Sequence, residues 1–310
     1  MAYSSGGLIQ ASDINGFLNN NTNKLNYVWG AGGGNQGYGQ TEITAVSVGD
    51  IVVASPWTNL INHIKNMASH QGTSITSRTT PATGDLISFM SNIDADIGSL
   101  TTNRLNAASQ GGTSSSTATT SASWSDAATF TLSAAFTSYN NARYFFNAGG
   151  QLSVAMSHSS STNINGLIQR ICSHLGTLWL SSGSCTLAGT SYTGTTQVSG
   201  GGSSTITTGT SFYNTGTMAV IKDTTAYTGG GDGGTGPNPD TTNYTDSTAM
   251  TVSVAISGGT VTITVVLDEV PNGAVVASGT SATITSRPPS TTYLTNSWSG
   301  PTLSSSVTQS

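Results

Sequence analysis

The side chains that could perform acid–base chemistry are few and scattered in this sequence. Glutamate occurs only at positions 42 and 269. Hydrolysis of a glycosidic bond needs two carboxylates held about 5–9.5 Å apart, and no helical or strand spacing creates such a pair. Asp94 and Asp96, for example, are two residues apart and do not share a helical face. We therefore expect the carboxylates to be solvated groups with no catalytic role.

Histidine and cysteine form no complete metal site or nucleophilic centre. His63 and His70 lie seven residues apart on one expected helix, but no carboxylate or thiol accompanies them to complete a zinc site. Cys172 and Cys185 are predicted to be reduced, partly buried thiols, with a disulfide as the alternative. The sequence around Ser184 lacks the Gly-x-Ser-x-Gly pattern of a nucleophile elbow. These observations predict a protein with no enzymatic activity, no metal and no cofactor.

Composition excludes further classes of protein. The chain has 310 residues, of which only 7% are charged, against about 25% in typical proteins. Its 8 Lys and Arg residues are too few for a nucleic-acid-binding surface, and no apolar run reaches the roughly 18 residues of a membrane span. The first residues show no secretory signal pattern, so we expect the chain to stay in the cytoplasm of the cell that makes it.

Serine and threonine replace the missing charges: together they number 98, and glycine adds 38. Charge normally keeps protein surfaces apart. A neutral surface rich in hydroxyl groups therefore favours packing against other copies or other chains. An extracellular surface that must ignore salt is the alternative.

The elements expected at the N-terminus repeat. Residues 8–19 and 51–62 match at an offset of 43, with an identical Ala-Ser pair in each copy. Ser12 and Ser55 are suited to cap a helix, and Pro56 fits the first helical position. Each copy therefore predicts a short extended segment followed by an amphipathic helix.

A third and looser copy begins at Gly84 and leads into a longer helix with a heptad-like apolar pattern. This stripe could dock on its own domain or form a seam between chains. We take it as the candidate self-assembly seam, which consists of Leu86, Met90, Ile93, Ile97 and Leu100.

The remaining chain changes to a period of two. Residues 251–256 and 260–265 alternate strictly on either side of Ser257-Gly258-Gly259, which predicts a β-hairpin. A helix is expected at 163–176, ending near Gly176. Further strands are expected at 129–132, 144–146, 151–156, 177–180, 204–208 and 217–222.

Together these patterns predict an α+β fold, in which an N-terminal repeated strand-helix module precedes a mainly antiparallel, β-sandwich-like domain. The expected divisions are a helical attachment or oligomerisation module at 1–107, a Ser/Thr/Gly linker at 108–123, a β-rich domain at 124–300 and a flexible tail at 301–310.

Several phrases of the sequence resemble structural proteins of tailed bacteriophages, especially the tail-fibre-like and appendage proteins of aquatic phages. They are residues 11–17, 28–30, 37–40, 54–60, 70–72, 143–150, 275–280 and 287–289. The resemblance implies a non-enzymatic virion component of the tail or an appendage (fibre, neck or baseplate-associated), assembled in the host cytoplasm. It offers no defined binding residue.

The expected partners are further copies of the chain and other virion proteins. A trimer is our first expectation, from the short heptad stripe, and a hexamer is the alternative. A capsid decoration protein and a carbohydrate-binding adhesin, which would recognise a host surface glycan, remain the competing functions.

Overall fold

The computed structural model describes residues 11–19, 24–47, 49, 53–82, 92–159, 163–182, 249–268 and 275–310, together with the backbone of five short strands between 184 and 222. The chain divides into two compact units. The first unit comprises residues 1–111, 143–150 and 288–299, and the second comprises the rest. The first unit therefore takes two segments from the region that the sequence assigns to the β-rich domain.

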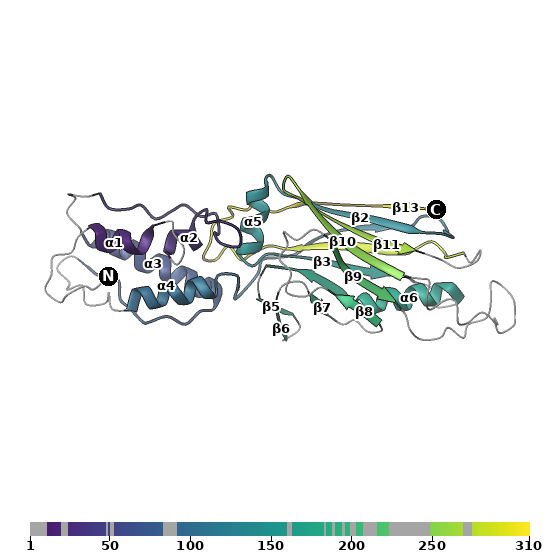
Figure 1. Ribbon diagram of the computed structural model, residues 1–310, viewed down its shortest axis with the longest axis horizontal. Helices are drawn as coiled ribbons and strands as arrows, with labels where there is room; N and C mark the ends of the chain where they lie inside the picture. The colour runs from purple at the N-terminus through teal and green to yellow at the C-terminus, as the bar shows by residue number, and fades with distance from the viewer. Residues whose placement is uncertain are drawn as a thin grey trace. The chain divides into compact units, whose positions relative to one another are not determined.

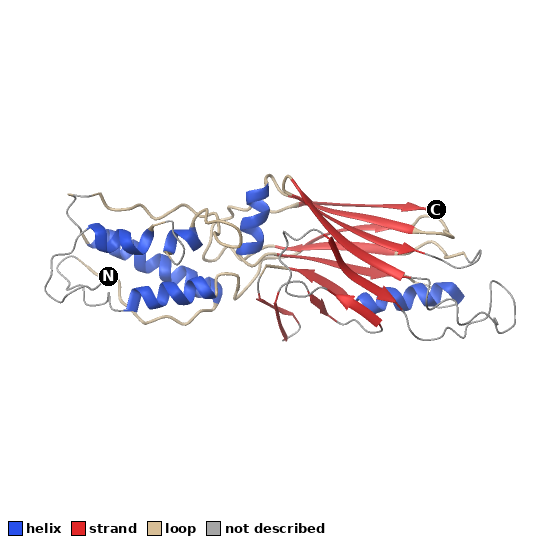
Figure 2. Ribbon diagram, in the orientation of Figure 1, coloured by secondary structure: helices blue, strands red, loops and turns tan. Residues whose placement is uncertain are grey.

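In the described part of the first unit, helices α1 to α4 pack on one another (Figures 1 and 2). They are α1 (Ala11–Leu18), α2 (Leu25–Trp29), α3 (Ala54–Gln71) and α4 (Ile93–Thr102). The helix expected in each repeat is present, but it begins two residues earlier than the capping pattern predicts, at Ala11 and Ala54 in place of Asp13 and Pro56. Val53 is the N-cap residue of α3, so Ser55 and Pro56 lie inside its first turn. Pro56 costs little there, because backbone N–H groups of the first turn have no intrahelical acceptor.

The described part of the self-assembly seam is already covered by its own chain. Ile93, Ile97 and Leu100 on α4 are at most 1% exposed, and α4 packs against α1, α2 and α3. The assignment of these three residues to a contact between copies is therefore wrong: the apolar stripe docks on its own unit. Leu86 and Met90 lie outside the described residues.

Side-chain amides hold the extended segments of the first unit. Asn26 donates to the carbonyl of Ile43 at 3.0 Å and accepts from its N–H at 2.9 Å. Asn15 forms the same two bonds with Val46, at 2.7 and 2.9 Å. Each amide therefore replaces a neighbouring strand and satisfies both backbone groups without introducing a charge.

The second unit contains the antiparallel sheets, which confirms the α+β fold class. A five-stranded sheet has the order β1-β12-β3-β4-β7, and a six-stranded sheet has the order β13-β2-β11-β10-β9-β8. A separate hairpin joins β5 to β6. Helix α6 (Asn163–Leu175) contacts β3 of one sheet and β8, β9 and β10 of the other.

The strand bounds are β1 Ser114–Thr119, β2 Ala128–Ala135, β3 Gln151–Ser157, β4 Thr177–Leu180, β5 Ser184–Leu187, β6 Thr190–Thr193, β7 Thr196–Val198, β8 Ser203–Ile206, β9 Gly216–Lys222, β10 Ala249–Ser257, β11 Thr260–Asp268, β12 Ser281–Arg287 and β13 Thr302–Gln309. Alternate residues of β2, β10, β11 and β12 are buried, so one face of each strand fills the core.

The predicted hairpin is confirmed. β10 and β11 pair from Ala249 opposite Asp268 to Ser257 opposite Thr260. Gly258 and Gly259 form the two-residue turn, with φ angles of 57° and 100°. Two positive φ values match the primed turn whose twist fits a tight hairpin, and glycine adopts them without strain.

The strand expected at 144–146 is wrong, because these residues belong to helix α5 (Tyr139–Asn147). The hydroxyl of Ser138 accepts a hydrogen bond from the N–H of Asn141 at 3.2 Å, the geometry of a helix N-cap. The aromatic run lies on a helix whose Ala142, Phe145 and Phe146 are buried.

Two further expectations are wrong, namely the linker at 108–123 and the flexible tail at 301–310. Strand β1 occupies much of the first segment and pairs with β12, and β13 occupies most of the second and pairs with β2. Both strands are rich in Ser and Thr, which fit a pleated surface as well as they fit a loop. Low sequence complexity therefore concealed two edge strands.

Candidate interaction surface

The outer face of the six-stranded sheet carries a regular array of hydroxyl groups. The residues that alternate with the buried core residues point outward on four adjacent strands, β13, β2, β11 and β10. Strand pairing aligns them in four rows: Thr308, Thr129, Val266 and Thr251; Ser306, Thr131, Thr264 and Ser253; Ser304, Ser133, Thr262 and Ala255; and Thr302, Ala135, Thr260 and Ser257. We call these residues the hydroxyl face.

The hydroxyl face contains Ser and Thr except at Ala135, Ala255 and Val266, and none of its residues is charged. The four β13 residues are exposed, and the outward residues of the central strands β2 and β11 are half-buried by their neighbours, apart from the exposed Ala135. Neighbouring strands lie about 4.8 Å apart, and successive outward residues on one strand about 6.7 Å apart. The face is therefore a dense grid of small polar side chains.

The five-stranded sheet has a similar outer pattern on β1 and β12. Three hydroxyl pairs cross between these strands: Ser115 with Thr285 at 2.9 Å, Thr117 with Thr283 at 2.9 Å and Thr119 with Ser281 at 2.8 Å. Opposed Ser and Thr side chains stabilise an antiparallel pair by hydrogen bonding across it. The β1–β12 pair shows how hydroxyl-rich strands associate in this protein.

Such surfaces are suited to contact with protein. Burial of an unpaired charge carries a large free-energy cost, whereas a hydroxyl group needs only one hydrogen-bond partner. Threonine also presents a methyl group beside its hydroxyl. The hydroxyl face shares one feature with the cores of protein–protein interfaces, which is the lack of charged residues; serine itself is not enriched in such cores.

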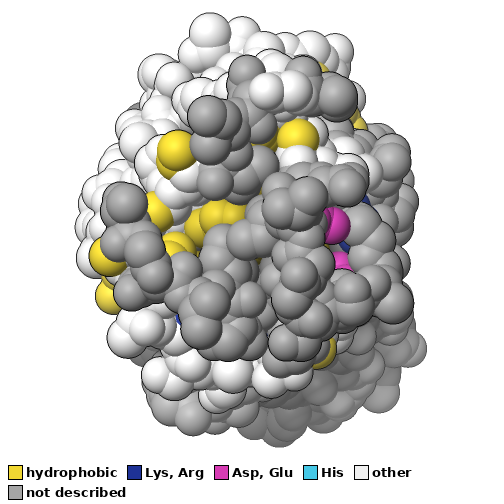
Figure 3. Space-filling model, turned by 90° about the vertical axis from the view of Figure 1, so that its left-hand side faces the viewer, with side chains coloured by type: hydrophobic (Ala, Val, Ile, Leu, Met, Phe, Trp, Pro, Cys, Tyr) yellow, Lys and Arg dark blue, Asp and Glu magenta, His cyan; other side chains and the backbone are white. Residues whose placement is uncertain are grey.

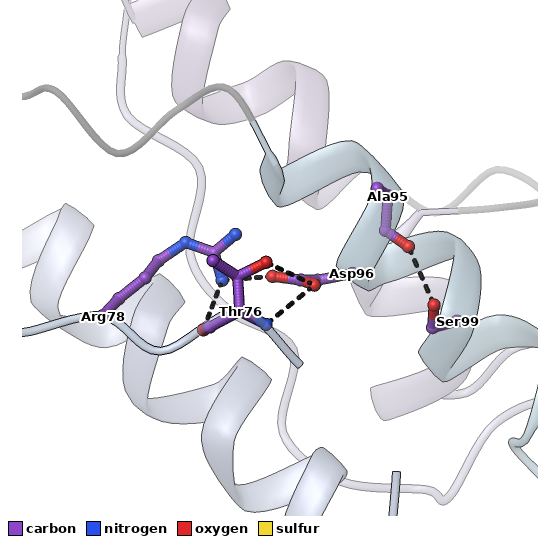
Figure 4. Close-up of polar contacts among 5 residues, drawn as sticks. All are labelled: Thr76, Arg78, Ala95, Asp96 and Ser99. Atoms are coloured by element: carbon purple, nitrogen blue, oxygen red, sulfur yellow. Dashed lines mark hydrogen bonds and ion pairs between the residues drawn. The ribbon is translucent and has the colours of Figure 1, made fainter. Parts of the chain in front are cut away.

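Two acidic residues of α4 have different environments, and one of them is buried. Asp96 on α4 is 6% exposed, and its Oδ1 accepts hydrogen bonds from the N–H of Thr76 at 3.1 Å and the Thr76 hydroxyl at 3.3 Å (Figure 4). Its Oδ2 forms an ion pair with the guanidinium of Arg78. Asp94 is exposed and pairs with Lys24 at 3.5 Å. The environment of Asp96 is that of a structural carboxylate that fixes the segment after α3.

The two best-buried histidines have hydrogen-bonding roles. Nε2 of His70 lies 2.9 Å from the carbonyl of Ala148, so it donates to that oxygen. Burial lowers the pKa of His70, while this hydrogen bond opposes the shift. Burial also lowers the pKa of His158, whose ring contacts the Thr280 hydroxyl at 2.9 Å and Oδ1 of Asn165 at 3.0 Å. Both rings serve as neutral packing groups.

The described residues contain no metal-ligand cluster, and their free thiol is buried. Within the described residues, no group of three His, Cys, Asp or Glu side chains lies close enough to hold a metal ion. Cys172 is a free, buried thiol, and burial raises its pKa to about 12. A thiol with so high a pKa is a poor nucleophile at neutral pH. The side chain of Cys185 lies outside the described residues.

The first unit has a groove of about 760 Å³ along the segment from Thr41 to Val46, facing Val53 and His63. The face shown in Figure 3 has apolar side chains at its surface, with few charged ones among the described atoms. The groove adjoins positions 48 and 50–52, which lie outside the described residues. We therefore assign it no ligand.

Sequence reasoning missed the hydroxyl face. Its signal is the alternation of Thr or Ser with apolar residues at 129–134 and 260–265, which was used to predict strands and not a surface. The rows appear only when the strand order is known, because β2 and β13 are far apart in the chain.

A scan against protein-family models gave no match, and searches of curated proteins and of solved structures gave none. Among the described helices, none has the length and apolar character required to cross a membrane.

Proposed function

We propose that this chain is a non-enzymatic structural component of a phage virion, in the tail or an appendage, and that it works by self-assembly and packing against other virion proteins. The observation that carries the proposal is the hydroxyl face, an uncharged and ordered surface on a sheet-rich unit. The resemblance of residues 54–60 and 143–150 to phrases of phage structural proteins supports the virion setting.

The hydroxyl face supports this role through its energetics. A virion component is assembled once and then stays buried against its neighbours. Burial of a Ser and Thr surface has a lower free-energy cost of desolvation than burial of a charged surface. Its binding is also insensitive to salt, because no charge is present to be screened. The same surface fits a capsid decoration protein, which would occur in many copies on the head.

Purified particles of the phage that encodes this chain test the proposal. We expect mass spectrometry of washed particles to find the chain, and gold-labelled antibodies against it to mark the tail, neck or fibres. Label over the whole head would favour the decoration protein. Absence from the particles would contradict a virion role, and glycan-array binding of the purified chain would then favour the adhesin.

A further inference from the structure

The two sheets of the second unit end on the same side in strands of similar chemistry. β1 is the first strand of the five-stranded sheet and β13 is the first strand of the six-stranded sheet. The strands lie against each other, and the hydroxyls of Ser116 and Ser305 are 2.9 Å apart. We call these two strands the β1/β13 edge. Figure 1 shows β13 along the margin of its sheet, beside β2.

The β1/β13 edge is open. On β2, the inward residues Phe130 and Leu132 are fully buried, whereas their β13 partners Val307 and Ser305 remain half-exposed although they point toward the core. On β1, Ser115, Thr117 and Thr119 are exposed. Among the strands that the structure describes, each has a sheet partner on one side only.

The edge also lacks the devices that normally prevent strands from pairing. Exposed edges are protected by lysine, proline, bulges or inward-pointing charges. β1 and β13 contain no charged residue and no proline, and both keep a continuous register with their neighbours. An eight-residue edge without such protection is a template for another strand.

We propose that the β1/β13 edge pairs with the same edge of a second copy of this chain, so that both sheets continue into the partner. This inference rests on the proposed function, because it names the surface and the partner through which self-assembly occurs. A two-fold axis normal to the sheets places β13 antiparallel to the partner's β13 and, in the other sheet, β1 antiparallel to the partner's β1. One symmetry operation thus satisfies both edges.

The side chains suit this self-pairing. In an antiparallel register centred on Ser306, Ser304 faces Thr308 of the second copy, and Ser306 faces its own equivalent. These contacts reproduce the hydroxyl pairs that already join β1 to β12. No like charges meet, because the edge has none, and the hydroxyl face continues without interruption from one copy to the next.

The first experiment is light scattering on the purified full chain, with and without Ser306→Lys and Thr117→Lys. We expect the wild type to have twice the 31.4 kDa mass of the chain. The lysine variants should shift the dimer–monomer equilibrium toward monomer by 10-fold or more, because Ser306→Lys places its charge against its own equivalent and Thr117→Lys introduces a charge on the β1 side of the same edge. Thr262→Lys is the matched control: it adds the same charge to the hydroxyl face on β11, away from the edge, and should remain dimeric.

A charge-pairing experiment identifies the contact. Ser306→Glu should also be monomeric, and an equimolar mixture of the Ser306→Lys and Ser306→Glu variants should recover the dimer. If circular dichroism shows that a charged variant is unfolded, Ser306→Cys in a Cys185→Ser background replaces it. The cysteine variant should form a disulfide-linked dimer on mild oxidation, because paired antiparallel strands bring Cα atoms within disulfide range.

A monomeric wild type overturns the inference, as does a dimer that the edge lysines leave intact or a Ser306→Cys variant that stays monomeric on oxidation. These outcomes are separate from the proposed function. If the chain is a dimer but is absent from particles, the pairing stands and the virion role is contradicted. If the chain is monomeric but is found in tails, the virion role stands and the pairing is contradicted.

Discussion

At the residue scale, the buried ion pair between Asp96 and Arg78 offers a direct test of the structure, because the chain has so few charged residues. Asp96→Ala leaves the guanidinium of Arg78 buried without its carboxylate, and loss of one partner of a buried pair costs about 3–5 kcal/mol. We expect the free energy of unfolding, measured by urea denaturation, to fall by that amount. The Thr76 hydrogen bonds are lost in the same variant.

Asp94→Ala is the matched control, because Asp94 lies two residues away on the same helix and its pair with Lys24 is exposed. Exposed pairs contribute about 0–1 kcal/mol. Equal losses in the two variants would contradict the structural role of Asp96.

The neutral state of His70 predicts a pH dependence. Because burial lowers the pKa of His70 below its ordinary value of 6.5, the unfolded chain takes up a proton before the folded protein does. The unfolded state therefore binds more protons as the pH falls below about 6.5, and the free energy of unfolding decreases there. His158 contributes with the same sign.

We expect urea midpoints to decrease from pH 7.5 to pH 5, and His70→Gln to reduce this slope. An unchanged slope in His70→Gln would show that His70 is not the group responsible.

At this scale, the sequence alone predicts which residues are buried, but it does not predict which elements cover them. The heptad spacing of Ile93, Ile97 and Leu100 marks an apolar helix face correctly. The same spacing suits a neighbouring helix of the same chain or of another chain, and only the contacts with α1, α2 and α3 decide between them.

At the element scale, the turn of the β10–β11 hairpin has two neighbouring glycines that differ in the space available for a side chain. A Cβ on Gly259 would lie 2.5 Å from the carbonyl carbon of Ser138, and φ there is 100°. A Cβ on Gly258 would meet no atom within 4 Å, and φ is 57°. Gly259→Ala should therefore destabilise the protein by about 1–3 kcal/mol, whereas Gly258→Asn should change stability by less than about 1 kcal/mol.

Thermal or urea unfolding of the two variants measures this difference. If Gly258→Asn were the more damaging substitution, the turn geometry given above would be incorrect.

Elements with a strong period were predictable. The hairpin alternates strictly, and α6 ends at Leu175 before Gly176, whose φ is 58°. The Tyr144–Phe146 run was ambiguous, because three aromatic residues fit a strand or a helix until the Ser138 cap is recognised. β1 and β13 were missed because their sheet partners are distant in the chain: β1 pairs with β12, and β13 pairs with β2.

At the scale of the whole molecule, each unit is closed by segments distant in sequence. The side-chain amide of Gln40 donates to the carbonyl of Thr295 at 3.0 Å and accepts from its N–H at 2.8 Å. No local pattern predicts this contact, since 255 residues separate the partners. It is one reason why the first unit includes residues 288–299.

Gln40→Ala should loosen that segment. We expect hydrogen exchange of the Thr295 amide to accelerate by about 10-fold or more, because the removed acceptor leaves this N–H open to solvent, with a loss of stability of about 1–3 kcal/mol. Amides of β2 and β11 in the second unit should keep their exchange rates. Unchanged exchange at Thr295 would show that the amide does not hold the segment.

The central claim is that the uncharged Ser/Thr surfaces of the second unit exist to be buried against other protein. Because we propose that the chain is a phage virion component, a density map of the intact particle with this chain traced in it tests the claim most directly. We predict that the β1/β13 edge or the hydroxyl face is covered by neighbouring subunits in the tail or an appendage. A traced chain with both surfaces in open solvent would contradict it.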